Sequence, residues 1–262
     1  MSSTFAALFS SLALAVSSAQ AANVYVFSTG NAAVDSAYSA ALAARGHAAT
    51  IGVQWNAFDG SVNLAGFNAV FMNMSANWSS SSGQVSLAGQ QQLVNFVNAG
   101  GGLITTEWII YNNGQSGGAS YATLMPILPA TYGSTWNSTS QTTFSQVTPD
   151  PIMNADLPSS FLINNNSFAG GTETRLFARP GATVFYQSSN MSSTGIVNAG
   201  LSGWGVGAGR VVSISNMPGL TSLNETNYRT LLGNAVNWVS IPSPGAIGVL
   251  GLAGLLAARR RR

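Results

Sequence analysis

The stretch SLAGQQQLVNFVNAGGGLITTE, residues 86–107, decides the class of fold. Its first part, Ser86 to Asn98, predicts a helix whose leucines and valines are spaced to face a sheet. The run Gly100-Gly101-Gly102 ends that helix, because glycine is favoured just past a helix C-terminus. Leu103 to Glu107 then predicts a buried strand. A helix that passes through a glycine turn into a buried strand is typical of an α/β domain.

The same alternation extends toward the N-terminus. Strands are predicted at 23–27, 47–53 and 67–74, and an alanine-rich helix is predicted at 31–44. The strands are nearly continuous apolar runs, which fits burial on both faces. Repeated strand–helix units therefore predict a parallel sheet with right-handed crossovers.

The second half of the chain is less regular. The sequence predicts a short helix at 121–128, an exposed strand within 134–147, little periodicity over 149–168, strands at 182–186, 195–201 and 210–215, and a last helix at 224–239. We therefore expect a three-layer, doubly wound α/β domain of the flavodoxin-like kind over residues 23–240. Its sheet should be mostly parallel, with a β-rich irregular insertion.

Several segments in this range resemble the class I glutamine-amidotransferase-like superfamily, and its trehalose-utilisation branch most nearly. They are Arg45-Gly46-His47 before the second strand, Phe67-Asn-Ala-Val70 into the third, Phe96 to Ile104, Gly207 to Val212, Leu231 to Trp238, and Asp150-Pro151-Ile152, where that branch often has His-Pro-Ile. The resemblance covers most of residues 23–240 and implies the fold. It does not by itself give a function.

The resemblance also implies where a site would lie. In the true amidotransferases a cysteine nucleophile follows the strand that here ends near Thr106. This chain has Thr105-Thr106-Glu107-Trp108 at that place and no cysteine at any position. A cysteine–histidine pair cannot be built, so glutaminase activity does not carry over.

Composition excludes further classes of site. The chain has no cysteine and a single histidine, His47, so thiolate metal sites and multi-histidine zinc sites are excluded. Four of the nine basic residues are the terminal Arg259, Arg260, Arg261 and Arg262, and without them five arginines face seven acidic residues. The net charge of +2 is therefore no argument for nucleic acid binding. We expect no cofactor and no metal.

Both ends of the chain predict export. Phe5 to Val16 is apolar, and Ala19-Gln20-Ala21 fits signal-peptide cleavage, so residues 1–21 are predicted to be a signal peptide. Residues 241–262 join Pro242-Ser243-Pro244 to a short apolar run and the four arginines, which stay on the cytoplasmic side of a membrane. This tail resembles the PEP-CTERM sorting signal, with serine where that family usually has glutamate.

The tail resemblance implies a processing partner and a destination. An exosortase-type enzyme would process the tail, which would hold the chain in the inner membrane transiently before release to the cell surface or extracellular matrix. An ordinary single-span tail anchor is the alternative. The resemblance implies nothing about activity.

Glu107 is the main candidate for chemistry. It is predicted at the C-terminal end of a central strand, where ligands of open α/β sheets gather. A carboxylate beside Trp108 could act as an acid or base, or hydrogen-bond a sugar hydroxyl. It could equally cap the next helix or loop. A glycosidase-like pair of Glu107 with Asp59 or Glu173 is conceivable, although the sequence cannot bring them together.

Aromatic residues supply the other candidates. Trp78 and Trp136 lie in segments rich in serine and asparagine, where an aromatic ring beside amide groups can hold a sugar. They could equally fold back onto the domain. His47 is predicted to be a turn histidine satisfied by the backbone, and Gly205 to Gly209 is predicted to be a hairpin turn rather than a phosphate loop, since a strand follows it.

Two functions remain open from the sequence. The first is an exported, non-catalytic surface or matrix protein that binds exopolysaccharide, another carbohydrate or a surface protein through its amidotransferase-like domain. The alternative is a hydrolase of the trehalose-utilisation type that uses Glu107. The missing cysteine–histidine pair favours the first.

Overall fold

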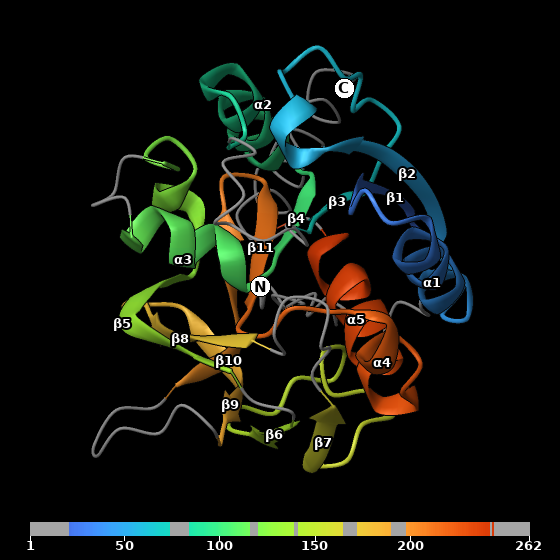
Figure 1. Cartoon of the computed structure of the whole chain (residues 1–262), viewed down its shortest axis with the longest axis vertical. Coiled ribbons are helices and arrows are strands. Elements are labelled where there is room, and N and C mark those ends of the chain that lie inside the picture. Colours follow the sequence, from blue (N-terminus) through green and yellow to red (C-terminus); the bar gives the residue numbers. More distant parts are fainter. Residues whose placement is uncertain are drawn as a thin grey trace, which may run out of the picture.

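The computed structural model describes residues 21–73, 84–115, 120–138, 141–164, 172–189, 198–241 and 243, and its centre is a nine-stranded sheet (Figure 1). The strand order is β2-β1-β3-β4-β11-β10-β9-β6-β7. The first five strands in this order pair in parallel and the rest pair antiparallel. The α/β class is confirmed, and the sheet is mixed.

The strands of the large sheet are β1 (Asn23–Ser28), β2 (Ala48–Gln54), β3 (Ala69–Met72), β4 (Gly102–Thr105), β6 (Gln141–Gln146), β7 (Ser160–Asn164), β9 (Thr183–Ser188), β10 (Ala199–Val206) and β11 (Gly209–Ile214). A separate pair joins β5 (Ala130–Ser138) to β8 (Thr172–Ala178). The helices are α1 (Ala32–Ala43), α2 (Leu87–Asn98), α3 (Glu107–Gln115), α4 (Leu220–Leu223) and α5 (Thr226–Val239), with single 3-10 turns at η1 (Trp55–Ala57) and η3 (Met125–Ile127).

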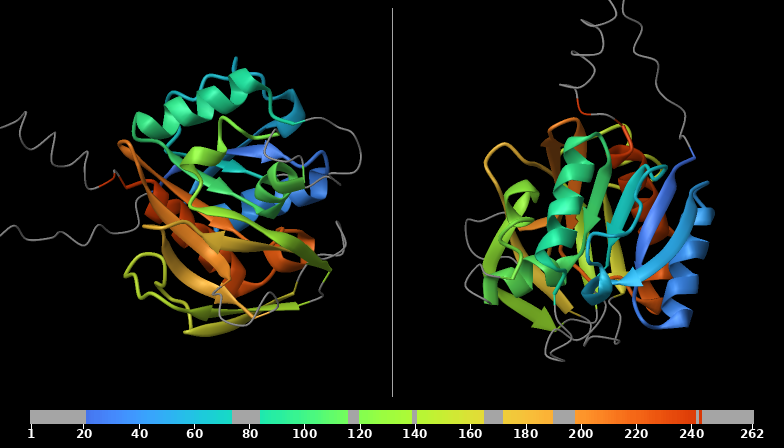
Figure 2. Two further views of the ribbon diagram at one scale, coloured as in Figure 1. Left: turned by 90° about the vertical axis from the view of Figure 1, so that its left-hand side faces the viewer. Right: turned by 90° about the horizontal axis from the view of Figure 1, so that it is seen from above.

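Helices lie on both faces of the parallel part of the sheet (Figures 1 and 2). One apolar cluster joins α1, α4 and α5 to one face, and a second joins α2 and α3 to the other. Strand residues alternate between the clusters: Val26 and Phe71 belong to the first, Phe27 and Met72 to the second. This alternation explains why the strands are apolar at nearly every position.

The second half departs from the sequence expectation. The segment expected to be an irregular insertion adds β6 and β7 to the main sheet. Together with β9 and β10, which correspond to predicted strands, they pair antiparallel, so the sheet is not parallel throughout. Strands β7 and β8 and helix α3 were not predicted. The hairpin prediction for Gly205 to Gly209 is confirmed, because β10 and β11 pair antiparallel across Gly207.

The two described ends of the domain lie on one side (Figure 2). Ala22 precedes β1, and Ser243 is held at the β10–β11 turn, where its hydroxyl donates to Gly207 O at 2.7 Å and its N–H donates to Ala208 O at 2.8 Å. No helix of the described residues is long and apolar enough to cross a membrane. The predicted signal peptide up to residue 20, and Pro242, Pro244 and the four terminal arginines, lie outside the described residues.

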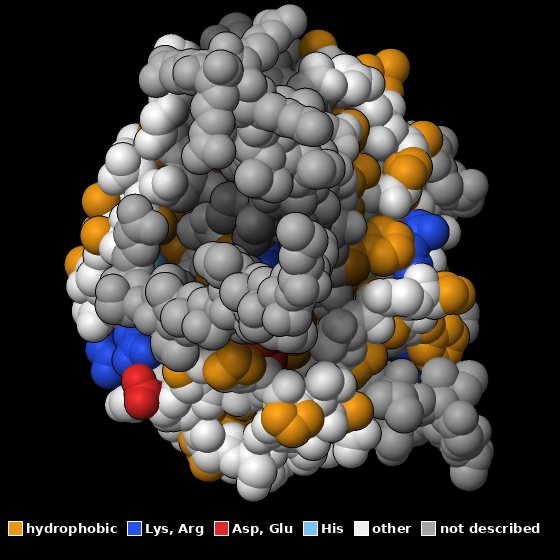
Figure 3. All heavy atoms as spheres, turned by 180° about the vertical axis from the view of Figure 1, so that it is seen from behind, with side chains coloured by type: hydrophobic (Ala, Val, Ile, Leu, Met, Phe, Trp, Pro, Cys, Tyr) orange, Lys and Arg blue, Asp and Glu red, His pale blue; other side chains and the backbone are white. Residues whose placement is uncertain are grey.

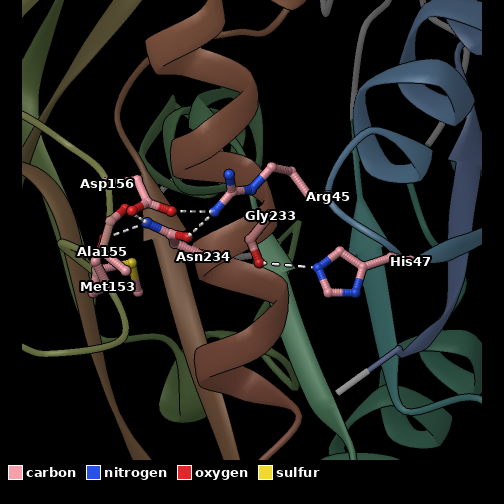
Figure 4. A network of polar contacts seen from close by, with 7 residues as sticks. All are labelled: Arg45, His47, Met153, Ala155, Asp156, Gly233 and Asn234. Atoms are coloured by element: carbon pink, nitrogen blue, oxygen red, sulfur yellow. Dashed lines mark hydrogen bonds and ion pairs between the residues drawn. The ribbon is translucent and has the colours of Figure 1, made fainter. Parts of the chain in front are cut away.

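Arg45, His47 and Asn234 form a polar network around α5, to which Asn234 itself belongs (Figure 4). His47 is buried, and its Nε2 lies 3.2 Å from Gly233 O, so one ring nitrogen pairs with the backbone as expected, while Nδ1 is buried and has no partner. Asn234 Nδ2 donates to the carbonyls of Met153 and Ala155, while its Oδ1 accepts from Arg45. The network therefore joins the α1–β2 turn to the loop before β7, and it is structural.

Candidate functional site

The parallel strands β1, β3, β4 and β11 end at one edge of the sheet, which we call the carboxyl edge. Their register places Val26 beside Phe71, Phe71 beside Ile104, and Ile104 beside Val212. Ligands of open α/β sheets bind at this edge. The residues that close these strands therefore form the candidate site.

Polar residues close all four strands on the face that carries α1 and α5. Two residues beyond the buried Val26, Phe71, Ile104 and Ile214 lie Ser28, Asn73, Thr106 and Asn216. Side chains alternate along a strand, so we infer that all four face the same side.

Contacts to the helices support this placement. Ser28 Oγ donates to Asp35 of α1 at 2.7 Å, and the Tyr228 hydroxyl of α5 donates to Asn216 Oδ1 at 3.2 Å. Together with Tyr38 of α1, these residues form the carboxyl-edge array: Ser28, Tyr38, Asn73, Thr106, Asn216 and Tyr228.

Asn73 is the unusual member of the carboxyl-edge array. Its side chain is completely buried, yet both Oδ1 and Nδ2 lack a hydrogen-bond partner. An unpaired buried polar group costs about 1–3 kcal/mol, so native proteins keep few of them. Such a group at a strand end where ligands bind indicates a site.

Tyr38 is a second buried polar group of the array. Its ring packs edge-on against Phe71 at 5.2 Å between centroids, and its hydroxyl has no hydrogen-bond partner. Burial raises the pKa of Tyr38 well above its usual range, and Tyr228 and Asp35 raise it further. The Tyr38 hydroxyl therefore stays neutral and can act as donor or acceptor.

Glu173 of β8 lies beside the same edge. It is fully buried, it forms a bridge with Asn216, and it accepts from Ser215 Oγ at 2.6 Å and from Thr142 Oγ1 at 3.2 Å. Burial raises the pKa of Glu173, and hydrogen bonding from nearby Ser188, Ser215 and Thr142 opposes that rise. Its oxygens are thus engaged by hydroxyl groups of the protein.

Glu107 follows the end of β4, where the sequence predicted a site, but it belongs to helix α3 and not to the strand. Strand β4 ends at Thr105, and Glu107 is the first residue of α3 rather than the last of a strand. Thr105, the last residue of β4, is tied to β11 through its Oγ1, which lies 2.8 Å from Ser213 Oγ. The role of the Glu107 side chain, which is not among those described, stays a prediction.

The three candidate tryptophans have different outcomes. Trp108 is buried, its indole N–H donates to Met217 Sδ at 2.8 Å, and its ring packs edge-on against Tyr111. These contacts are those of a core residue. Trp136 lies in β5, paired with Thr174 in the backbone register, and Trp78 falls outside the described residues. Sugar binding by Trp78, Trp108 and Trp136 stays a prediction.

Asp59 and Asp35 have local roles. Asp59 is exposed and accepts from Ser61, and Asp35 accepts from Ser28 and Thr29 at the start of α1. Among the described residues no three histidine or acidic side chains gather as a metal site would require. The members of the carboxyl-edge array are amides, hydroxyls and phenols, so the chemistry that they offer is hydrogen bonding by neutral groups.

Sequence reasoning missed Asn73 and Asn216. Each is an asparagine that directly follows a run of buried strand residues, at Phe71-Met72-Asn73 and Ile214-Ser215-Asn216. A polar amide that closes a predicted parallel strand is a usable signal, because the fold brings all such ends together.

Comparison with known proteins gives a fold. No protein-family model matches the chain, and no curated protein matches its sequence. Solved structures do match. A cytoplasmic protein of Salmonella typhimurium LT2 has a TM-score of 0.60 at 10% identity, with 83% of this chain and 98% of that chain covered. A ThuA-like protein from Bacteroides uniformis has a TM-score of 0.54 at 13% identity, with 83% and 90% covered.

The fold resembles that of ThuA-like proteins. The same ThuA-like fold also matches part of a β-galactosidase from Rahnella sp. R3, with a TM-score of 0.55 at 14% identity, where 86% of this chain corresponds to 32% of that one. Identities this low show the fold alone.

Proposed function

We propose that this chain is an exported, non-catalytic protein whose ThuA-like domain binds a neutral carbohydrate at the carboxyl edge. The observation that carries the proposal is Asn73, a fully buried amide with neither polar atom paired. We also propose that the parallel part of the sheet, together with the helices on its two faces, has the three-layer arrangement of amidotransferase-like domains.

A neutral polyhydroxy ligand fits the chemistry of the carboxyl-edge array. Asn73 offers one acceptor and two donor hydrogens, and the Tyr38 hydroxyl offers both roles. Each hydroxyl group of a sugar likewise donates and accepts. The array is built from amides, hydroxyls and phenols, so it offers no permanent charge to pair with an ionic ligand.

The carboxylates near this edge support binding over hydrolysis. Glycoside hydrolysis needs two carboxyl groups on opposite sides of the scissile bond. Asp35 is engaged by Ser28 and Thr29, and Glu173 is buried under hydroxyl groups. Hydrolysis with Glu107 remains the alternative, because α3 begins with that residue at the end of β4.

The binding proposal is tested by replacing Asn73 with leucine, which is similar in size. We expect Asn73→Leu to abolish binding of neutral oligosaccharides at the carboxyl edge while raising the free energy of unfolding by about 1–3 kcal/mol, since an unpaired buried amide is removed. Calorimetric titration and urea unfolding measure the two effects. Gln91→Leu, which removes an exposed amide on α2, is the control and should leave binding intact.

Two results would contradict this proposal. Unchanged binding of the same oligosaccharide by Asn73→Leu would place the ligand elsewhere. Release of new reducing ends by the wild type, abolished by Glu107→Gln, would establish hydrolysis.

Export and sorting form the second half of the proposal. The predicted signal peptide and the PEP-CTERM-like tail support it, and both described ends of the domain lie on the side away from the carboxyl edge. We expect mature protein from native cells to begin near Ala22 and to end near Ser243, released to the cell surface by an exosortase-type enzyme. Mass spectrometry of both termini checks this; an intact Arg262 in the inner membrane would indicate a permanent anchor.

A further inference from the structure

A shallow pocket of about 500 Å³ lies at the opposite edge of the sheet, where the parallel strands begin. We call this the amino-edge pocket. Asn68 marks its position, because its Oδ1 accepts from the N–H of Asn23 at the start of β1 and its carbonyl accepts from Gly102 at the start of β4. The last turn of α2 and its glycine turn form the other wall.

The amino-edge pocket combines aromatic rings with an uncharged lining. Phe67 and Phe96 both line it and are half-buried, so part of each ring meets solvent. None of the lining residues is charged. Figure 3 views the side of the molecule where the described ends lie, and on its uncovered part charged side chains are few.

Amide groups surround the two rings. Gln92 donates through Nε2 to Val62 O, while its Oε1 is buried and has no partner. The Oδ1 atoms of Asn68 and Asn95 accept from Asn23 N–H and Gln91 Nε2, respectively. The pocket therefore offers amide N–H donors on the two asparagines, and the unpartnered Gln92 Oε1 lies buried at its wall.

We propose that the amino-edge pocket is a second binding site, and that it takes a neutral pyranose residue. The C–H faces of a pyranose pack against phenylalanine rings, and its hydroxyl groups pair with amides. The negative end of the α2 dipole lies at this wall and disfavours an anionic ligand. This inference does not depend on the proposed function, because the two sites lie at opposite edges of the sheet.

The experiment is NMR titration of the full chain with the methyl glycosides of glucose, galactose and mannose. We expect at least one to shift the backbone amides of Gly100 and Gly101 and the side-chain amide of Gln92 in a saturable manner. Phe96→Leu and Gln92→Leu should each weaken this binding roughly tenfold. Phe96→Leu keeps an apolar side chain against Gly101, so folding is preserved.

Other variants and probes separate this site from alternatives. Asn73→Leu should leave these shifts unchanged, whatever becomes of the carboxyl edge. Methyl glucuronide should bind more weakly than the matching glucoside, because the pocket disfavours an anion. The inference is overturned if no glycoside shifts these amides, if Phe96→Leu and Gln92→Leu bind as the wild type does, or if the glucuronide binds equally well.

Discussion

Gly209→Ala is expected to lower the free energy of unfolding by about 3 kcal/mol, at the upper end of the cost of overpacking. A Cβ on Gly209 would lie 2.2 Å from Gly101 O and 2.4 Å from Val97 O. Both atoms belong to the backbone at the end of α2, so neither can move as a flexible side chain would. Either the start of β11 or the end of α2 must shift.

Urea unfolding followed by circular dichroism measures this effect. Gly205→Ala is the matched control, since Gly205 lies in the same hairpin and a Cβ there meets only Ser243 Cβ at 3.4 Å and Gly209 O at 3.9 Å. We expect the control to unfold within about 1 kcal/mol of the wild type. Equal unfolding midpoints for the two variants would show that α2 and β11 are not packed this closely.

The first half of the fold could be predicted because its signals are local. Strands β1 and β3 are short apolar runs, and α1 and α2 have capping residues, Asn31 and Ser86, whose side chains accept from the first-turn N–H groups. The residues that mark where each strand and helix begins and ends lie within the strand–helix unit itself. Neighbouring units then determine the parallel order.

Helix α3 was missed because it lacks a polar face in its first turns. Trp108, Ile109, Ile110 and Tyr111 are all buried. Helical periodicity depends on contrast between buried and exposed positions, and here there is none. The preceding Thr105 and Thr106 favour a strand, so the local pattern extends β4 through Glu107.

Strand β8 was missed for the opposite reason. Its sequence, Thr-Glu-Thr-Arg-Leu-Phe-Ala, begins with polar residues, yet Glu173 and Thr174 are completely buried. The groups that satisfy Glu173 come from β6 and from the end of β11, thirty-one and forty-two residues away. No local pattern contains such partners.

Glu173 supplies the second large expected effect, which depends on pH. Its folded pKa is raised above the ordinary value of 4.5, first by burial. The folded protein therefore holds this proton more tightly than the unfolded chain. The stability that Glu173 contributes is complete below about pH 4.5 and is lost as the pH rises through the folded pKa.

Glu173→Gln removes this dependence, because glutamine keeps an acceptor and cannot ionise. We expect the variant and the wild type to be close in stability at low pH. Above the unfolded pKa the wild type should lose stability relative to the variant, by up to about 1.4 kcal/mol for each pH unit until the folded pKa is passed. Urea unfolding of both proteins, repeated at intervals of about one pH unit from roughly pH 4 to pH 8, measures the difference in their free energies of unfolding.

A second variant separates ionisation from hydrogen bonding. Glu173→Leu cannot accept from Ser215 or Thr142, so we expect it to be less stable than Glu173→Gln by about 2 kcal/mol at every pH. Parallel stability profiles for the wild type and Glu173→Gln would contradict the raised pKa. Ser215 immediately precedes Asn216, so ionisation of Glu173 would also disturb the carboxyl-edge array. Oligosaccharide binding by the wild type should therefore weaken over the same pH interval in which its stability falls.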